Sequence, residues 1–164
     1  MGNLLNVLKV PPIHSDCVFC DVTSEKGFNV VAQNDKFIAF HDRNPASKVH
    51  ILVIPKDHHR TLPLSDLAAS TSTCVSSRAT RLLACITHAT SSTWNLGFHI
   101  PPFNSVNHLH LHVQVLPYRS SFRKFKYRVA KGHEPRSKGF SWFVTLRQAI
   151  SILDKGDHVG VLPC

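Results

Sequence analysis

The sequence predicts an α+β domain with a mainly antiparallel five-stranded sheet, one long helix and a shorter helix near its end. Short segments rich in β-branched and apolar residues are separated by turn residues, which is typical of strands. One longer segment in the middle of the chain instead repeats apolar residues at helical spacing. Because strands come before and after this helix rather than alternating with helices, a mainly antiparallel sheet is favoured.

The first half of the chain contains three predicted strands. Residues 28–33 and 36–41 are separated by the turn-prone pair at 34–35, so these two segments predict a hairpin. A largely apolar third strand covers residues 49–54 and ends at Pro55.

The second half begins with the long helix, which the apolar spacing predicts over residues 64–90. A strand over 94–100 and another over 106–116 follow, on either side of a loop that starts at Pro101. The last predicted element is a helix near residues 144–155.

Length and composition agree with one soluble domain, since 164 residues are enough to bury a core. The net charge of +9 favours anionic partners such as nucleotides, phosphates or nucleic acid. The N-terminal residues lack the features of a signal peptide, and no apolar run is long enough to span a bilayer. We therefore expect an intracellular protein, cytoplasmic or nuclear or both, without a membrane partner. Residues 1–16 would form a flexible arm before a catalytic domain over 17–155, with a basic extension from about residue 118.

Three histidines at alternating positions of the last predicted strand, His108, His110 and His112, carry the chemistry. On a strand every second side chain points to the same face, so the three imidazoles stand in a row while the intervening leucines point into the core. Imidazole can act as nucleophile, acid and base near neutral pH. A neutral ring that attacks a phosphorus centre forms a covalent intermediate, which water then cleaves. Ser105, in the preceding loop, is positioned to donate to phosphate oxygens.

The run over residues 108–114 resembles the motif of the histidine-triad family, and the match covers most of residues 17–117. Upstream, residues 40–42 and 50–58 resemble the nucleoside-binding strand pair of that family, and 97–108 resembles its third and fourth Hint-type branches. The resemblance implies a histidine-triad-like fold. It also implies an enzyme that cleaves adenosine 5′-phosphoramidate-type substrates to AMP through a covalent nucleotidyl-histidine intermediate.

The same resemblance implies a role for each matching position. His110 would be the nucleophile, and His112 would contact the phosphate and the leaving group. His50 would support the nucleophile, and Ser105 would bind phosphate as a further catalytic residue. Asp42 would bind the ribose hydroxyls, because a carboxylate only accepts hydrogen bonds. The other substrate-binding candidates match or adjoin the implied pocket and are Phe40, His41, Arg43, His99 and Asn104.

Several of these positions also have a plain structural explanation. His50 and Phe40 lie in apolar strands and suit a core, whereas Asp42 suits a turn cap and Ser105 a loop. Arg43 stands where the family usually has an apolar residue against the base, so base selectivity stays open.

The pair Cys17 and Cys20 has the C-x-x-C spacing of half a zinc site, although a redox pair or two buried thiols would have the same spacing. In many members of the family two histidines complete the site, and His58 and His108 match them here. The resemblance thus implies a structural Zn²⁺ ion with these four ligands. His59 is the rival to His58 because the two are adjacent.

Basic and aromatic residues crowd the stretch 118–138. Such a mixture can bind nucleic acid, but a solvated edge after the catalytic strand is the favoured explanation. The expected partners are a purine nucleotide as substrate and, as often in the family, a second copy of the chain in a homodimer; nucleic acid is not favoured. Three functions compete with the phosphoramidate reaction: removal of AMP from 5′-adenylated DNA ends, hydrolysis of dinucleoside polyphosphates, and nucleotide binding without catalysis.

Overall fold

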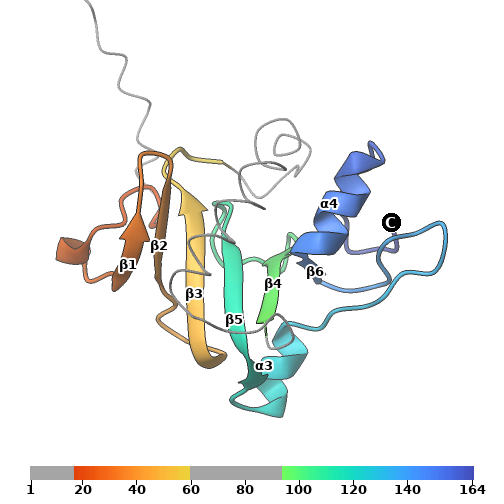
Figure 1. Ribbon diagram of the computed structural model, residues 1–164, viewed down its shortest axis with the longest axis horizontal. Coiled ribbons are helices and arrows are strands. Elements are labelled where there is room, and N and C mark those ends of the chain that lie inside the picture. Colours follow the sequence, from red (N-terminus) through yellow and green to blue (C-terminus); the bar gives the residue numbers. More distant parts are fainter. Residues whose placement is uncertain (1–16, 60–93) are drawn as a thin grey trace, which may run out of the picture.

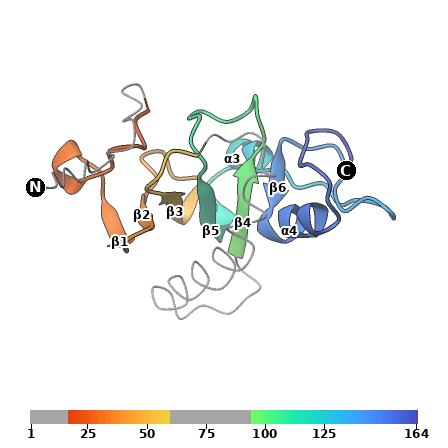
Figure 2. The same cartoon turned by 90° about the horizontal axis from the view of Figure 1, so that it is seen from above.

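The computed structural model describes residues 17–59 and 94–164, and six strands within these ranges form one sheet. The strands stand side by side in the order β1-β2-β3-β5-β4-β6, and each neighbouring pair is antiparallel (Figures 1 and 2). The predicted arm over 1–16 and the predicted long helix over 64–90 lie outside the described residues. The α+β class and the antiparallel sheet are confirmed.

The bounds of the strands differ from the predicted ones by a few residues at most of their ends. The strands are β1 (Val30–Gln33), β2 (Phe37–His41), β3 (Ser47–Pro55), β4 (Trp94–His99), β5 (Leu111–Tyr118) and β6 (Phe143–Thr145). The helices are a short 3₁₀ turn η1 (Ser24–Lys26), α3 (Ser121–Lys126) and α4 (Leu146–Asp154). None of these helices is long and apolar enough to cross a membrane.

The hairpin of β1 and β2 turns at Asn34. Its side-chain oxygen accepts hydrogen bonds from the backbone N–H groups of Lys36 and Phe37. An asparagine side chain that accepts hydrogen bonds from the backbone two or three residues further on takes the place of a backbone hydrogen bond in closing the turn. This hairpin brings Phe40 and Asp42, at the end of β2, toward the middle of the sheet.

The prediction of five strands is wrong because β6 adds a sixth strand on the outer edge of β4. Three residues are too few to show a period-2 pattern, so the sequence contains no signal for this strand. Gly97 makes the pairing feasible, because a Cβ atom at this position would lie 2.2 Å from the Val144 carbonyl oxygen. Directly after β6, the side chains of Thr145 and Gln148 form a capping box that starts α4.

The histidine strand also starts later than predicted, at Leu111 rather than at residue 106. Before that point the backbone N–H of Leu109 donates to the carbonyl of His59 instead of to a neighbouring strand. The alternation of faces nevertheless persists, since Leu109, Leu111 and Val113 all lie in the main apolar core. The histidines between them face the opposite side of the sheet from this core.

Candidate active site

A cavity of about 500 Å³ opens on the face of the sheet that carries the histidines. Its walls come from distant parts of the chain, which only the sheet order brings together. The lining residues are Phe19, Gly27, Phe28, Asn29, Phe40, His41, Asp42, Arg43, Asn44, Leu52, His99, Phe103, Ser105, His110, His112 and Lys126.

His110 lines this cavity with a ring whose tautomer is fixed. Its Nδ1 lies 2.6 Å from the carbonyl oxygen of His108. A carbonyl only accepts, so Nδ1 carries the proton and Nε2 keeps its lone pair. Burial lowers the pKa of His110, and the bond to the His108 carbonyl opposes this shift without cancelling it. The ring is therefore neutral near pH 7, with one nucleophilic nitrogen.

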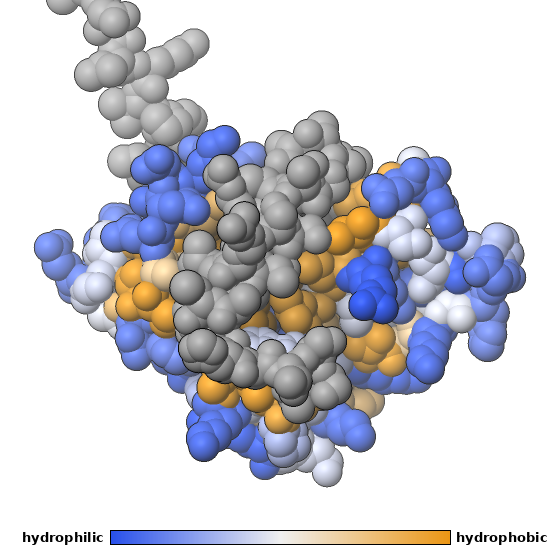
Figure 3. Space-filling view, viewed as in Figure 1, coloured by the Kyte–Doolittle hydropathy of each residue, from blue (hydrophilic) through white to orange (hydrophobic). Residues whose placement is uncertain are grey.

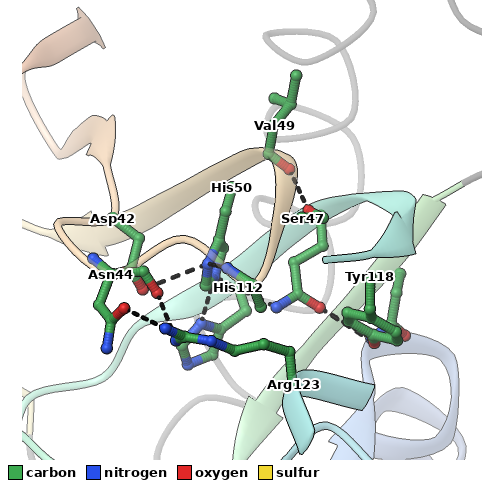
Figure 4. Close-up of polar contacts among 11 residues, drawn as sticks. Asp42, Asn44, Ser47, Val49, His50, His112, Tyr118 and Arg123 are labelled. Carbon is green, nitrogen blue, oxygen red and sulfur yellow. Dashed lines mark hydrogen bonds and ion pairs between the residues drawn. The ribbon is translucent and has the colours of Figure 1, made fainter. Parts of the chain in front are cut away.

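His112 belongs to a series of hydrogen bonds that begins at the backbone of Ala46; Figure 4 shows the part between His50 and His112. The Ala46 N–H donates to Nδ1 of His50 over 3.1 Å, so the proton of the neutral His50 ring resides on Nε2. This Nε2–H donates to Nδ1 of His112 over 2.9 Å. The proton of His112 must then be on Nε2, which is buried without a hydrogen-bond partner among the described residues. His112 thus lines the cavity with a fixed and unused N–H donor.

The imidazole rings of His50 and His112 are both neutral. Burial lowers the pKa of His50 to about 4 and the pKa of His112 well below the usual value. The Asp42 carboxylate lies 3.5 Å from Nδ1 of His50, and its charge opposes the shift of the His50 pKa only in part. Because the imidazole is uncharged, this contact is not an ion pair.

Asp42 lines the cavity and also fixes the turn after β2. One of its carboxylate oxygens accepts a hydrogen bond from the backbone N–H of Asn44 over 2.7 Å. Arg123 of α3 donates to the backbone carbonyl of Asn44 over 3.1 Å and also to its side chain (Figure 4). Asp42 therefore caps the turn, as one explanation from the sequence predicted, and at the same time lines the cavity.

His99 is buried at the other side of His112, with 6% of its surface exposed. Its ring centroid lies 4.9 Å from those of His112 and Tyr127, and 5.2 Å from that of Phe143. Burial, followed by the positive charge of Lys126, lowers the pKa of His99 to about 3, so this ring is neutral as well. Neither ring nitrogen has a hydrogen-bond partner in good geometry within the described residues.

The remaining candidates from the sequence fall into two groups. Phe40, His41, Arg43 and Ser105 line the cavity, and Phe40 is at the same time part of an apolar cluster. Asn104 is not among the lining residues, and its side-chain amide donates to the carbonyl of Val106. His50 lies behind His112 and reaches the cavity only through it.

Sequence reasoning missed several residues of the cavity wall. Phe19 and Phe28 come from segments before the sheet, Phe103 from the loop before the triad, and Lys126 from α3. The concentration of aromatic and basic residues after position 118 was a signal for Lys126, although it did not indicate where that side chain would point. The two N-terminal phenylalanines carried no comparable signal.

A second cluster joins the N-terminal segment to the histidine row. One ligand atom from each of Cys17, Cys20, His58 and His108 lies within 4.8 Å of the other three. Sγ of Cys17 lies 3.4 Å from Nδ1 of His108, and Sγ of Cys20 lies 3.0 Å from Nδ1 of His58. The group contains His58 and not the adjacent His59, so the geometry favours His58 of the two candidates from the sequence.

The donor set and its spacing fit a metal ion. In a tetrahedral zinc site, bond lengths near 2.3 Å to sulfur and 2.0 Å to nitrogen put neighbouring sulfur and nitrogen ligands about 3.5 Å apart. The distance of 3.8 Å between Sγ of Cys20 and Nδ1 of His108 lies close to this value. Nε2 of His108 lies 3.0 Å from the carbonyl of Pro55, so Nε2 carries the proton and Nδ1 faces the cysteines with a free lone pair.

Comparisons with known proteins match the chain to one family and to several relatives. Residues 16–128 match the family described as "Scavenger mRNA decapping enzyme C-term binding". The chain is 38% identical over 120 residues to the bifunctional adenosine 5′-phosphosulfate phosphorylase/adenylylsulfatase HINT4 of Arabidopsis thaliana, a match that covers 71% of this chain and 81% of the relative. It is 29% identical over 143 residues to the adenosine 5′-monophosphoramidase HINT3 of Danio rerio, covering 85% and 83%.

A likeness to solved structures concerns the fold alone. The crystal structure of a HIT family hydrolase from Legionella pneumophila Philadelphia 1 aligns with a TM-score of 0.53 at 24% sequence identity. The alignment covers 65% of this chain and 97% of that chain.

Proposed function

This chain belongs to the histidine-triad family, in its Hint-type branch, and we propose that it hydrolyses adenosine 5′-phosphoramidate-type substrates to AMP through a covalent intermediate on His110. The broader activity, that of a nucleotide hydrolase, follows from the family. The observation that carries the finer proposal is the tautomer of His110, whose protonated Nδ1 leaves Nε2 as a nucleophile in the cavity.

In the first step, Nε2 of His110 forms a bond to the α-phosphorus of the substrate and the bond from phosphorus to the leaving nitrogen breaks. The leaving nitrogen keeps the electron pair of that bond and takes up one proton from solvent. In the second step, a water oxygen binds to phosphorus, the bond between phosphorus and Nε2 breaks, and the water proton returns to solvent. AMP and a neutral His110 ring are the result.

Neighbouring donors would stabilise the negative charge that collects on the phosphoryl oxygens. His112 offers its Nε2–H, which the hydrogen bonds from Ala46 through His50 hold in place. Ser105 lines the same cavity with a hydroxyl group. A donor that is already oriented costs no reorganisation during the reaction, which is how such sites lower the barrier.

The adenosine would occupy the end of the cavity near β2. That end is lined by apolar side chains that suit a base, namely Phe19, Phe28, Phe40 and Leu52. Asp42 and His41 lie beside them, and the Asp42 carboxylate would accept hydrogen bonds from the ribose hydroxyls. Arg43 would border the base as a charged residue, and Asn104 would act on Ser105 through the loop that both share.

We further propose that Cys17, Cys20, His58 and His108 hold a structural zinc ion. Four protein ligands close a tetrahedral site, so the ion would have no open position for substrate. Its effect would be mechanical, because it would tie the N-terminal segment to the residue two positions before His110. Phe19, which lies between the two cysteines, contacts His110 with ring centroids 5.5 Å apart, so the same tie would hold the apolar end of the cavity.

All the described residues that line the cavity come from one chain. The outer edge of β4 is already paired with β6, so this edge is not available for a strand from a second copy. We therefore propose that an active monomer exists, and that a homodimer, if it forms, uses another surface. An intracellular location remains our proposal, consistent with a nucleotide as substrate.

The test is to measure hydrolysis of a fluorogenic adenosine phosphoramidate and to trap the covalent intermediate. We expect His110→Ala to reduce kcat/KM by a factor of about 10⁴ or more, because removing a nucleophile removes the pathway itself. His133→Ala, at an exposed histidine outside the cavity, is the matched control and should retain activity. Mass spectrometry of the quenched wild type should find AMP attached to His110. An adduct on a different residue, or normal turnover by His110→Ala, would contradict the proposed mechanism.

A further inference from the structure

The end of the cavity opposite to the adenosine is bordered by an aromatic surface that the reaction described so far does not use. It consists of Phe103, Phe125 and Trp142, which we call the aromatic platform. The ring centroid of Trp142 lies 5.9 Å from that of Phe103 and 4.9 Å from that of Phe125. Phe103 and Phe125 are 51% and 59% exposed. Single exposed apolar residues are ordinary, but a contiguous group beside a cavity suggests a binding surface.

The order of the strands gives this platform its place in the reaction. Phe40 lies on β2, His112 on β5 and His99 on β4, while Trp142 directly precedes β6. If adenosine lies near β2 and phosphorus near β5, the leaving group must extend toward β4 and β6. Phe103 lines the cavity and contacts Trp142, so the platform continues the cavity wall in that direction.

The platform also carries positive charge. The Arg128 guanidinium lies 6.0 Å from the ring centre of Trp142, and Lys126 lines the cavity. The indole N–H of Trp142 donates to the carbonyl of Lys126, which joins the ring to the end of α3. In the part of the chain that the structure describes, neither cation forms an ion pair with a carboxylate. Figure 3 shows hydrophobic and hydrophilic surface side by side at the lower end of the molecule, where α3 lies.

We propose that the aromatic platform with Lys126 and Arg128 binds a nucleotide unit of the leaving group, whose base stacks on the rings and whose phosphate meets the cations. This inference rests on the proposed function, since it names the leaving group of the same reaction. Exposed aromatic rings alone would suit any planar leaving group. Lys126 and Arg128, which have no carboxylate partner among the described residues, favour a leaving group that combines a planar ring with negative charge, which is the chemistry of a nucleotide. The source is either a single attached nucleotide or the first unit of a nucleic-acid strand.

The test compares three adenosine phosphoramidates that share the same reacting P–N bond. The leaving amines are methylamine, a 5′-amino-5′-deoxynucleotide 3′-phosphate, and a short single-stranded oligonucleotide that begins with the same 5′-amino nucleotide. The protein variants are Phe125→Ala, Arg128→Gln and, as a matched control, Phe140→Ala. Phe140 is also 51% exposed but does not belong to the platform.

We expect wild-type kcat/KM to be at least tenfold higher for the nucleotide-bearing substrates than for the methylamine substrate. Phe125→Ala should lower kcat/KM for the nucleotide-bearing substrates about tenfold, the value of one base stacked on an aromatic ring, and leave the methylamine substrate within twofold. Arg128→Gln should weaken the salt dependence of the nucleotide-bearing reactions, because fewer phosphate contacts release fewer counterions. Phe140→Ala should match the wild type throughout.

The outcomes separate the two proposals. Two results would show that the platform does not bind the leaving group, while the proposed function stands. In the first, wild type cleaves the methylamine substrate but has no higher kcat/KM for the nucleotide-bearing substrates. In the second, Phe125→Ala lowers kcat/KM equally for all three substrates. If wild type cleaves none of the three, the proposed function fails and the inference falls with it. If kcat/KM is equally high for the single-nucleotide and the oligonucleotide substrates, the natural substrate is a small dinucleotide-type molecule. If kcat/KM is higher still for the oligonucleotide, the natural substrate is the end of a nucleic-acid strand.

Discussion

The contact between Gly97 and β6 predicts that a single methyl group should disturb both stability and activity. In Gly97→Ala the new Cβ would lie 2.2 Å from the carbonyl oxygen of Val144 and 2.6 Å from the ring of Phe143. Real Cβ atoms do not come closer than 3.0 Å to a neighbour, so β6 would have to move away by about 0.8 Å. Overpacking of this kind costs about 1–3 kcal/mol, and more where backbone must shift. For a chain of this size, 3 kcal/mol corresponds to a Tm lower by roughly 6–12 °C.

The same displacement should reach the active site. Gly97 lies opposite His112 in the ladder of β4 and β5, and Phe143 of β6 packs against His99. We therefore expect kcat/KM of Gly97→Ala to fall even at temperatures where the variant is fully folded. Differential scanning calorimetry and hydrolysis of an adenosine phosphoramidate measure the two effects. Gly160→Ala is the control, since no atom of the described residues lies within 4 Å of its added Cβ. A Gly97→Ala protein with the Tm and activity of the control would refute the close pairing of β4 and β6.

Two further predictions concern acid and metal. Burial holds the folded-state pKa of His50 near 4 and that of His99 near 3, below the unfolded value of 6.5, so only the unfolded chain gains these protons as the pH falls through 6.5. The stability from each neutral ring is complete above pH 6.5 and is lost toward acid, by about 2 kcal/mol at pH 5. His99→Gln should therefore reduce the difference between urea unfolding at pH 7 and pH 5 by that amount; an unchanged difference would show that His99 titrates normally. Elemental analysis of purified wild type should find about one zinc ion per chain. Cys17→Ser should lose this ion and have a lower Tm, whereas the control Cys164→Ser should keep it. Equal metal content in the two variants would contradict the proposed ligands.

Part of the fold could be predicted from periodic patterns in the sequence, whereas α3 was not predicted and the predicted helix over 64–90 lies outside the described residues. The β1–β2 hairpin, the apolar β3, and β4 and α4 lie close to their predicted positions, since each has a period or turn of its own. The short β6 escaped prediction because its pairing depends on residues of β4 that lie 44 to 48 positions earlier in the chain. The start of β5 was misplaced for a similar reason, because the contact of Leu109 with His59 replaces a ladder bond.

Some features of the candidate site could also be predicted from local sequence patterns, and others could not. The spacing of residues 108–112 was enough to identify the chemical groups and the family, because alternation on an extended chain fixes which side chains share a face. Spacing contains no information on which ring nitrogen carries a proton. That depends on carbonyl and N–H groups supplied by other segments, and for His112 it traces back through His50 to the backbone of Ala46.

The local sequence was therefore sufficient to identify the reacting groups, since side chains on a strand alternate between its two faces wherever the strand lies in the fold. The state of those groups and the shape of the surface around them came from folding. Hydrogen-bond partners, burial and the aromatic platform arise where segments far apart in the chain meet. Phe103 and Trp142 become neighbours because β4 and β6 pair, and no pattern within either segment contains that contact.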